Sequence, residues 1–62
     1  MEKYKEYDKV ITLVEKENIP KGSIGGVVNI SNIGTYLVDF VNDDGTIKGL
    51  VSYSESEIKL CK

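Results

Sequence analysis

The apolar residues of this chain come in short runs, and residues that favour turns separate one run from the next. The runs cover about four to seven positions and are rich in Val, Ile and Tyr, whereas Gly, Pro, Asn and Asp stand between them. This spacing is typical of β-strands joined by tight turns. It predicts an all-β protein with strands over residues 9–15, 25–30, 35–41, 47–53 and 58–62.

The third predicted strand shows the clearest alternation of side chains. Tyr36, Val38 and Phe40 fall on one face, and we expect that face to line the core because side chains alternate across a strand. The opposite face carries Leu37, Asp39 and Val41, which we expect to lie outside the core.

Turn signals define the connections. Asn42-Asp43-Asp44-Gly45 predicts a tight hairpin after the third strand, because Asp and Gly tolerate the positive φ values that such turns need. Residues 16–24 read as a loop whose end is ordered by Pro20 and Gly22. In Ser54-Glu55-Ser56-Glu57, serine and glutamate have the spacing of a capping box, with room for one helical turn before the last strand. The apolar Ile58 and Leu60 of that strand are expected to close the core.

Length limits the chain to one domain, because 62 residues support a single small core. Five strands, a long first loop and a single 3₁₀ turn before the last strand predict a small SH3-like five-stranded barrel. We assign residues 7–62 to the barrel and residues 1–6 to an N-terminal extension.

Composition argues against several classes of function. The chain has one cysteine, Cys61, and no histidine, so we expect no disulfide within the chain, no metal or other cofactor, and no catalytic activity. Its start is too polar for a signal peptide, and no apolar run approaches the ~18 residues of a membrane span. A cytoplasmic protein without membrane contact is the resulting expectation.

Four stretches of the sequence resemble a known bacterial family. They are Tyr7-Asp8-Lys9-Val10, Pro20-Lys21-Gly22-Ser23-Ile24-Gly25-Gly26-Val27-Val28, Tyr36-Leu37-Val38-Asp39-Phe40-Val41 and Ser56-Glu57-Ile58-Lys59-Leu60. The family is the one described as domain of unknown function 4926, and the resemblance covers roughly Tyr7 to Leu60. It implies a stand-alone SH3-like protein, often encoded beside a predicted toxin gene and without enzymatic activity. The family's usual acidic residue is kept at Asp39, whereas Asn29 replaces another.

The resemblance implies a non-catalytic immunity or antitoxin protein that neutralises a neighbouring toxin by stoichiometric binding. Lys-Gly followed by Gly-x-Val-Val is also shared with KOW-type modules, so RNA or ribosome binding is the alternative. The net charge of −2 is unlike the basic surface that nucleic-acid binding usually requires. A third possibility is a homo-oligomer formed through exposed strand edges.

The candidate partner-binding residues follow from the protein-binding hypothesis. Carboxylates in the second half of the chain would attract a basic toxin, and a tyrosine at the end of the fourth strand would anchor it. We expect Tyr53 and Tyr4 to be partly exposed for this reason. The predicted binding residues are Asp39, Asp43, Asp44, Tyr53, Glu55 and Glu57.

Overall fold

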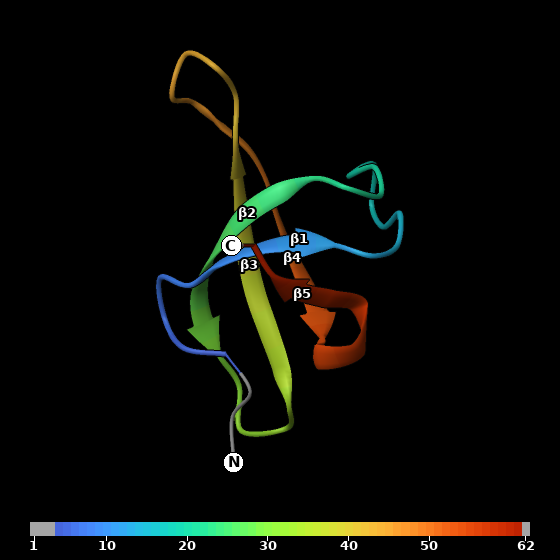
Figure 1. Ribbon diagram of the computed structural model, residues 1–62. Helices are drawn as coiled ribbons and strands as arrows, with labels where there is room; N and C mark the ends of the chain where they lie inside the picture. Colours follow the sequence, from blue (N-terminus) through green and yellow to red (C-terminus); the bar gives the residue numbers. More distant parts are fainter. Residues whose placement is uncertain (1–3, 62) are drawn as a thin grey trace.

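The computed structural model describes residues 4–61 of the chain and is all-β, as predicted. Five antiparallel strands form one sheet, and a single 3₁₀ turn, η1, precedes the last strand (Figure 1). The elements are β1 (Lys9–Thr12), β2 (Ile24–Ile30), β3 (Thr35–Val41), β4 (Ile47–Ser54), η1 (Glu55–Glu57) and β5 (Ile58–Leu60). No α-helix occurs in residues 4–61, and so none that is long and apolar enough to cross a membrane.

The strands lie in the order β4-β3-β2-β1-β5, so that the two C-terminal strands form the two edges of the sheet. Each of the first four strands pairs with its neighbour in sequence, while β5 returns to pair with β1 on the far side. Within the described part of the chain no strand pairing joins β4 to β5, so the sheet is open. Closure into a barrel therefore stays a prediction.

The first strand is shorter than the sequence pattern indicates, because the chain leaves the sheet after Thr12. The Thr12 hydroxyl is buried, donates a hydrogen bond to the Pro20 carbonyl at 3.1 Å and accepts one from the Ser23 amide at 3.0 Å. Beyond it, Lys16 and Ile19 form an isolated bridge around two residues with positive φ, Glu17 and Asn18. The β1–β2 loop is thus an ordered hairpin held at its base by Thr12.

The core lies on the face of the sheet that the alternation in β3 predicts. Tyr36, Val38 and Phe40 are buried, whereas Val41 is exposed, which confirms the predicted orientation of this strand. The other buried apolar residues are Tyr4, Val10, Ile19, Val27, Val51, Tyr53 and Ile58. The prediction was wrong for Leu60, which is 41% exposed, because β5 ends at this residue and only Ile58 reaches the core.

The predicted extension 1–6 is described only from residue 4 onward, and residues 1–3 and 62 lie outside the described part of the chain. Tyr4 belongs to the core, with 2% of its surface exposed. Its ring meets that of Tyr36 edge to face at 5.2 Å, and its hydroxyl donates to the Ile58 carbonyl at 2.9 Å. The segment before β1 therefore carries at least one residue that the folded domain uses.

Candidate functional site

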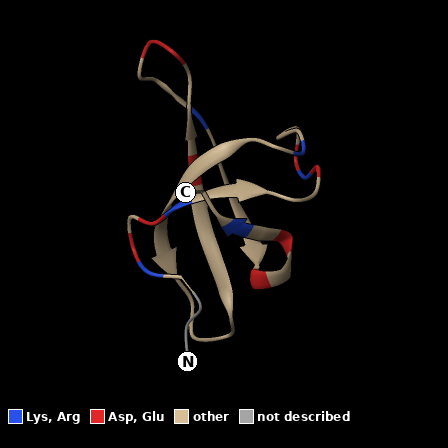
Figure 2. Ribbon diagram, in the orientation of Figure 1, with Lys and Arg blue, Asp and Glu red and all other residues tan. Residues whose placement is uncertain are grey.

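The hairpin between β3 and β4 carries two of the predicted carboxylates at its tip. Asp43 and Asp44 are both exposed, and Figure 2 shows them at the end of the hairpin that extends farthest from the sheet. We call this pair the acidic tip. Gly45 takes a φ of 89° to close the turn, and its amide donates to the Asn42 carbonyl at 2.9 Å. The turn chemistry predicted for this segment is confirmed.

One side chain of the acidic tip is held in place by the turn. The Asp44 carboxylate accepts hydrogen bonds from the Thr46 hydroxyl at 2.7 Å and from the Thr46 amide at 3.0 Å. These bonds, the hydroxyl first, lower the pKa of Asp44 below its ordinary value. Asp44 therefore keeps its negative charge at neutral pH while also stabilising the turn.

The remaining predicted carboxylates divide between the two ends of the molecule. Asp39 lies on the outward face of β3, where its Oδ1 accepts from the Gly26 amide at 3.3 Å. Glu55 and Glu57 lie in η1, directly after β4 and thus at the opposite end of that strand from the acidic tip (Figure 2). The predicted site residues do not form one cluster: Asp39, Asp43 and Asp44 share the hairpin, whereas Glu55 and Glu57 are separate from them.

Glu57 has a structural role in η1. Its Oε1 accepts from the Ser54 amide at 2.8 Å and lies 3.4 Å from the Lys16 ammonium, in a half-buried ion pair. The Ser54 amide is the main reason that the pKa of Glu57 is lowered, and Lys16 adds to it. The bond from the Ser54 amide confirms the predicted capping of η1 by Glu57. Among the described contacts, Glu55 has no comparable structural role.

The prediction that Tyr53 is partly exposed was wrong. Its side chain is fully buried, because Tyr53 lies on the same face of β4 as Val51 and pairs with the buried Tyr36. Its ring meets Phe40 edge to face at 6.1 Å, and the Lys16 ammonium lies 5.4 Å from the ring centre. Tyr53 is thus unavailable as an anchor on the surface. Tyr4, the other tyrosine expected to be exposed, is also a core residue.

The Tyr53 hydroxyl is buried and has no hydrogen-bond partner among the described residues. Burial raises the pKa of this phenol, and the nearby Glu57 and Glu17 carboxylates raise it further. A buried hydroxyl without a partner costs about 1–3 kcal/mol in lost hydration.

Replacement of this tyrosine by phenylalanine should therefore not destabilise the protein. We expect Tyr53→Phe to leave the free energy of unfolding unchanged or to raise it by up to about 1 kcal/mol, as measured by urea denaturation. A loss of more than about 1 kcal/mol would show that the hydroxyl has a hydrogen-bond partner, such as an ordered water molecule.

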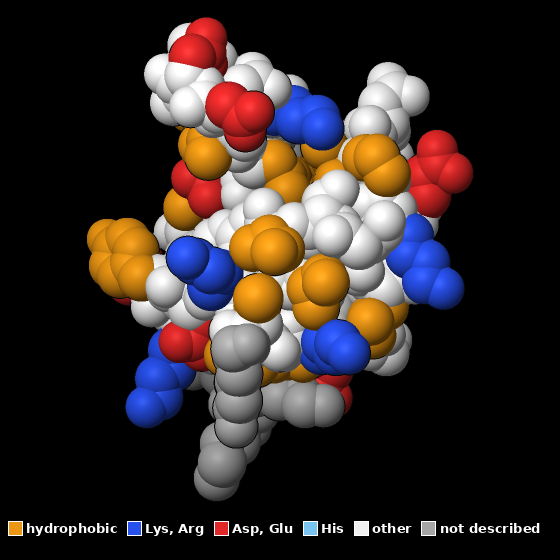
Figure 3. Space-filling view, turned by 45° about the horizontal axis from the view of Figure 1, so that its top comes forward, with side chains coloured by type: hydrophobic (Ala, Val, Ile, Leu, Met, Phe, Trp, Pro, Cys, Tyr) orange, Lys and Arg blue, Asp and Glu red, His pale blue; other side chains and the backbone are white. Residues whose placement is uncertain are grey.

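Sequence reasoning placed Val41 outside the core but missed two further exposed apolar side chains beside it at the base of the acidic tip. Val41 and Ile47 pair directly across the hairpin and are 59% and 64% exposed. Leu50 pairs with Asp39 one row further along the same outward face and is 52% exposed. We call Val41, Ile47 and Leu50 the hairpin patch. In Figure 3, hydrophobic side chains are exposed between the acidic tip and nearby lysines.

A signal for part of this patch was present in the sequence. The outward position of Val41 follows from the alternation in β3, whereas the positions of Ile47 and Leu50 depend on a register shift between Phe40 and Val41. This bulge adds one residue to β4, so strict alternation along β4 places Ile47 and Leu50 on opposite faces. Only the paired structure shows that they share a face.

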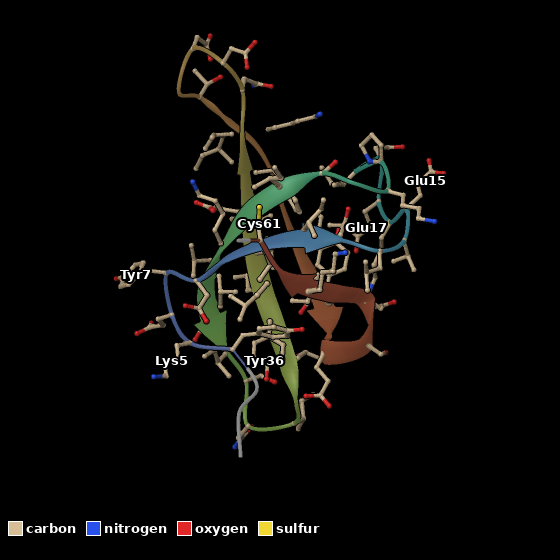
Figure 4. The ribbon with its side chains drawn as sticks, viewed as in Figure 1. Lys5, Tyr7, Glu15, Glu17, Tyr36 and Cys61 are labelled. Carbon is tan, nitrogen blue, oxygen red and sulfur yellow. The ribbon has the colours of Figure 1, made fainter. Side chains whose placement is uncertain are left out.

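A shallow hollow lies at the other end of the molecule, between the β2–β3 turn and η1. It has a volume of about 640 Å³, and Tyr36 and Glu55 are among its lining residues (Tyr36 is labelled in Figure 4). The rest of its described lining is Ile30, Ser31, Asn32, Gly34 and Ser54. Glu55 is the one charged residue in this described lining, so the hollow is mildly acidic.

No group of three or more potential metal ligands occurs in the part of the chain that the structure describes. Cys61 is a free, half-buried thiol near the end of β5 (Figure 4). Comparison of the chain with protein-family models, with curated proteins and with solved structures found no match. The site must therefore be interpreted from its own geometry.

Proposed function

We propose that this protein is a non-catalytic binding module that captures a basic protein partner in a stoichiometric complex. The observation that carries the proposal is the acidic tip, two exposed carboxylates at the end of the protruding hairpin with an exposed apolar patch at their base. Carboxylates at a protruding point attract a positively charged surface from a distance, and apolar side chains beside them supply affinity once water is excluded.

The same proposal includes closure of the sheet into an SH3-like barrel. The strand order β4-β3-β2-β1-β5, the ordered loop after β1 and the 3₁₀ turn before β5 support that assignment. The resemblance to the domain of unknown function 4926 family adds the expectation of an immunity or antitoxin role, in which the basic partner is a toxin encoded beside this protein. Such a role requires binding and no catalysis by this chain.

Charge favours a protein partner over the alternative of RNA or a ribosomal surface. Lys16 is engaged by Glu57 and the Ser52 carbonyl, and Lys48 is exposed on β4, close in sequence to the acidic tip. The lysines are spread over several segments of the ribbon in Figure 2. A dispersed set of lysines in a chain of net charge −2 is a poor match for a phosphate backbone.

The proposal is tested by affinity capture of the tagged protein from its own cells, with and without nuclease treatment. A single protein partner that is retained at near equal stoichiometry after nuclease treatment would support protein capture. Retention of ribosomal proteins that disappears with nuclease would instead establish the RNA-binding alternative.

Neutralisation of the acidic tip is expected to slow capture of the partner. We predict that the double variant Asp43→Asn and Asp44→Asn lowers the association rate about tenfold at low salt, while dissociation changes less. Surface plasmon resonance with the captured partner measures both rates. Glu55→Gln, which removes one charge beyond the far end of β4 and away from the acidic tip, is the distant control and should leave the association rate within about twofold. Equal effects of the two variants would contradict a role for the acidic tip.

A further inference from the structure

The strand that carries the hairpin patch is also an edge of the sheet. β4 is the longest described strand, and within residues 4–61 it pairs on one side only, with β3. Natural proteins usually shorten, cover or charge such an edge, because its free amides and carbonyls pair readily with another extended chain. A long strand such as β4, with one side unpaired among the described residues, therefore needs a functional explanation.

One contact shows which backbone groups of β4 face outward. The Lys16 ammonium donates to the Ser52 carbonyl at 2.8 Å, so this carbonyl points away from β3. In an antiparallel pair the amide and carbonyl of one residue point to the same side, and every second residue repeats the arrangement. No register shift separates Leu50 from Ser52. The Leu50 amide and carbonyl and the Ser52 amide therefore lie on the free edge.

The N-terminal half of this edge is the more open half. Lys16 from the β1–β2 loop occupies the Ser52 carbonyl, and Ile19 from the same loop reaches towards the inner face near Gly49. Toward the acidic tip, Ile47 and Leu50 are more than half exposed. Figure 1 shows that this end of the hairpin extends beyond the other strands. Backbone hydrogen-bonding groups, apolar side chains and carboxylates thus meet at one place.

We propose that the free edge of β4 binds an extended basic segment of the partner protein, which adds a sixth strand to the sheet. This inference rests on the proposed function and assigns the surface that performs it. Strand addition takes affinity from main-chain hydrogen bonds and specificity from alternate side chains. The apolar side chains of the segment face outward and pack on the hairpin patch, and cationic side chains at its end near the turn reach Asp43 and Asp44. The segment is basic because the three carboxylates of the hairpin, Asp39, Asp43 and Asp44, outnumber Lys48, its one cation.

The test uses a synthetic peptide of about seven alternating lysine and valine residues, the length of an ordinary strand. Amide hydrogen exchange of the full protein, read residue by residue by NMR, is measured with and without this peptide. We expect the Leu50 and Ser52 amides to exchange at least about tenfold more slowly when the peptide is bound. A peptide of alternating glutamate and valine is the charge control and should leave both amides unchanged.

A pair of variants separates the contribution of the Leu50 amide to peptide binding from that of the Leu50 side chain. Leu50→Pro removes an outward amide that makes no bond to β3 and should weaken binding of the basic peptide at least about tenfold. Leu50→Ala removes the side chain but keeps the amide and should weaken binding by about threefold. If Leu50→Pro does not fold, the exchange measurement on the unaltered protein decides the question.

Several outcomes would overturn the assignment of the edge. They are unchanged exchange at Leu50 and Ser52 with the basic peptide, equal protection by the acidic peptide, and protection that rises with protein concentration before any peptide is added. The last result would assign the edge to a second copy of this chain. The proposed function is tested separately. If a nuclease-resistant partner binds but leaves the Leu50 and Ser52 amides exchanging freely, protein capture is supported and binding at the β4 edge is refuted.

Discussion

A Gly25→Ala substitution is expected to remove most of the protein's free energy of unfolding at 25 °C. A Cβ atom at this position would collide with the Asp39 carbonyl oxygen and would lie 2.7 Å from Val38 Cγ1 and 2.9 Å from Phe40 Cδ1. The first of these is backbone in the paired strand and cannot rotate away. Overpacking of this kind costs about 3 kcal/mol or more, and a core of this size supplies only about 3–5 kcal/mol of net stability.

Gly49→Ala is the matched control for this prediction. Gly49 also lies in a strand, but a Cβ there would meet only Ile19 Cδ1 at 3.6 Å, an ordinary contact distance. This variant should be as stable as the unaltered protein or more stable by up to about 1 kcal/mol, because alanine restricts the unfolded chain. Urea denaturation followed by tyrosine fluorescence measures both variants. A loss of less than about 1 kcal/mol for Gly25→Ala would contradict the crowding between β2 and β3.

The two glycines that begin the second predicted strand show how far the sequence determines this fold. Glycines at the start of a strand permit either a sharp bend or the close approach of another strand, and the surroundings of Gly25 show the close approach. Sequence alone did not show that Gly25 faces inward against Val38 while Gly26 faces outward and donates to Asp39. That difference depends on the register between β2 and β3, which is set by the whole sheet.

Strand positions could be predicted because each strand carries its own alternation and its own turn signals. The turn at Asn42 to Gly45 and the inward face of β3 are local properties of this kind. The burial of Tyr53 could not be predicted in the same way, since a tyrosine near a strand end suits both an interface and a core. Its environment is fixed by pairing with Tyr36 and by Phe40, which is distant in sequence.

The candidate site was predictable for its charges but not for its apolar part. Turn residues Asp43 and Asp44 are exposed by the geometry of the turn itself, so the acidic tip follows from the sequence. The hairpin patch arises only because a bulge near Val41 brings Ile47 and Leu50 onto one face. Bulges that change which side chains share a face have a weak local signature, and they often occur near functional surfaces.

Loss of Tyr4 is expected to destabilise the protein as strongly as loss of a central core residue. Its ring packs edge to face on Tyr36, and its hydroxyl bonds to the Ile58 carbonyl in β5, so it links the segment before β1 to two strands. We predict that Tyr4→Ala lowers the free energy of unfolding by about 3–5 kcal/mol, most of the total stability.

Tyr7 offers a matched control, because it is the same residue type three positions later and is 83% exposed (Figure 4). Tyr7→Ala should change stability by no more than about 0.5 kcal/mol. Tyr4→Phe keeps the ring but removes the hydrogen bond to Ile58 and should cost about 1 kcal/mol. Equal stability of Tyr4→Ala and Tyr7→Ala in urea denaturation would show that residues 1–6 are an extension, as the sequence predicted. A large difference would establish that the folded domain begins no later than Tyr4.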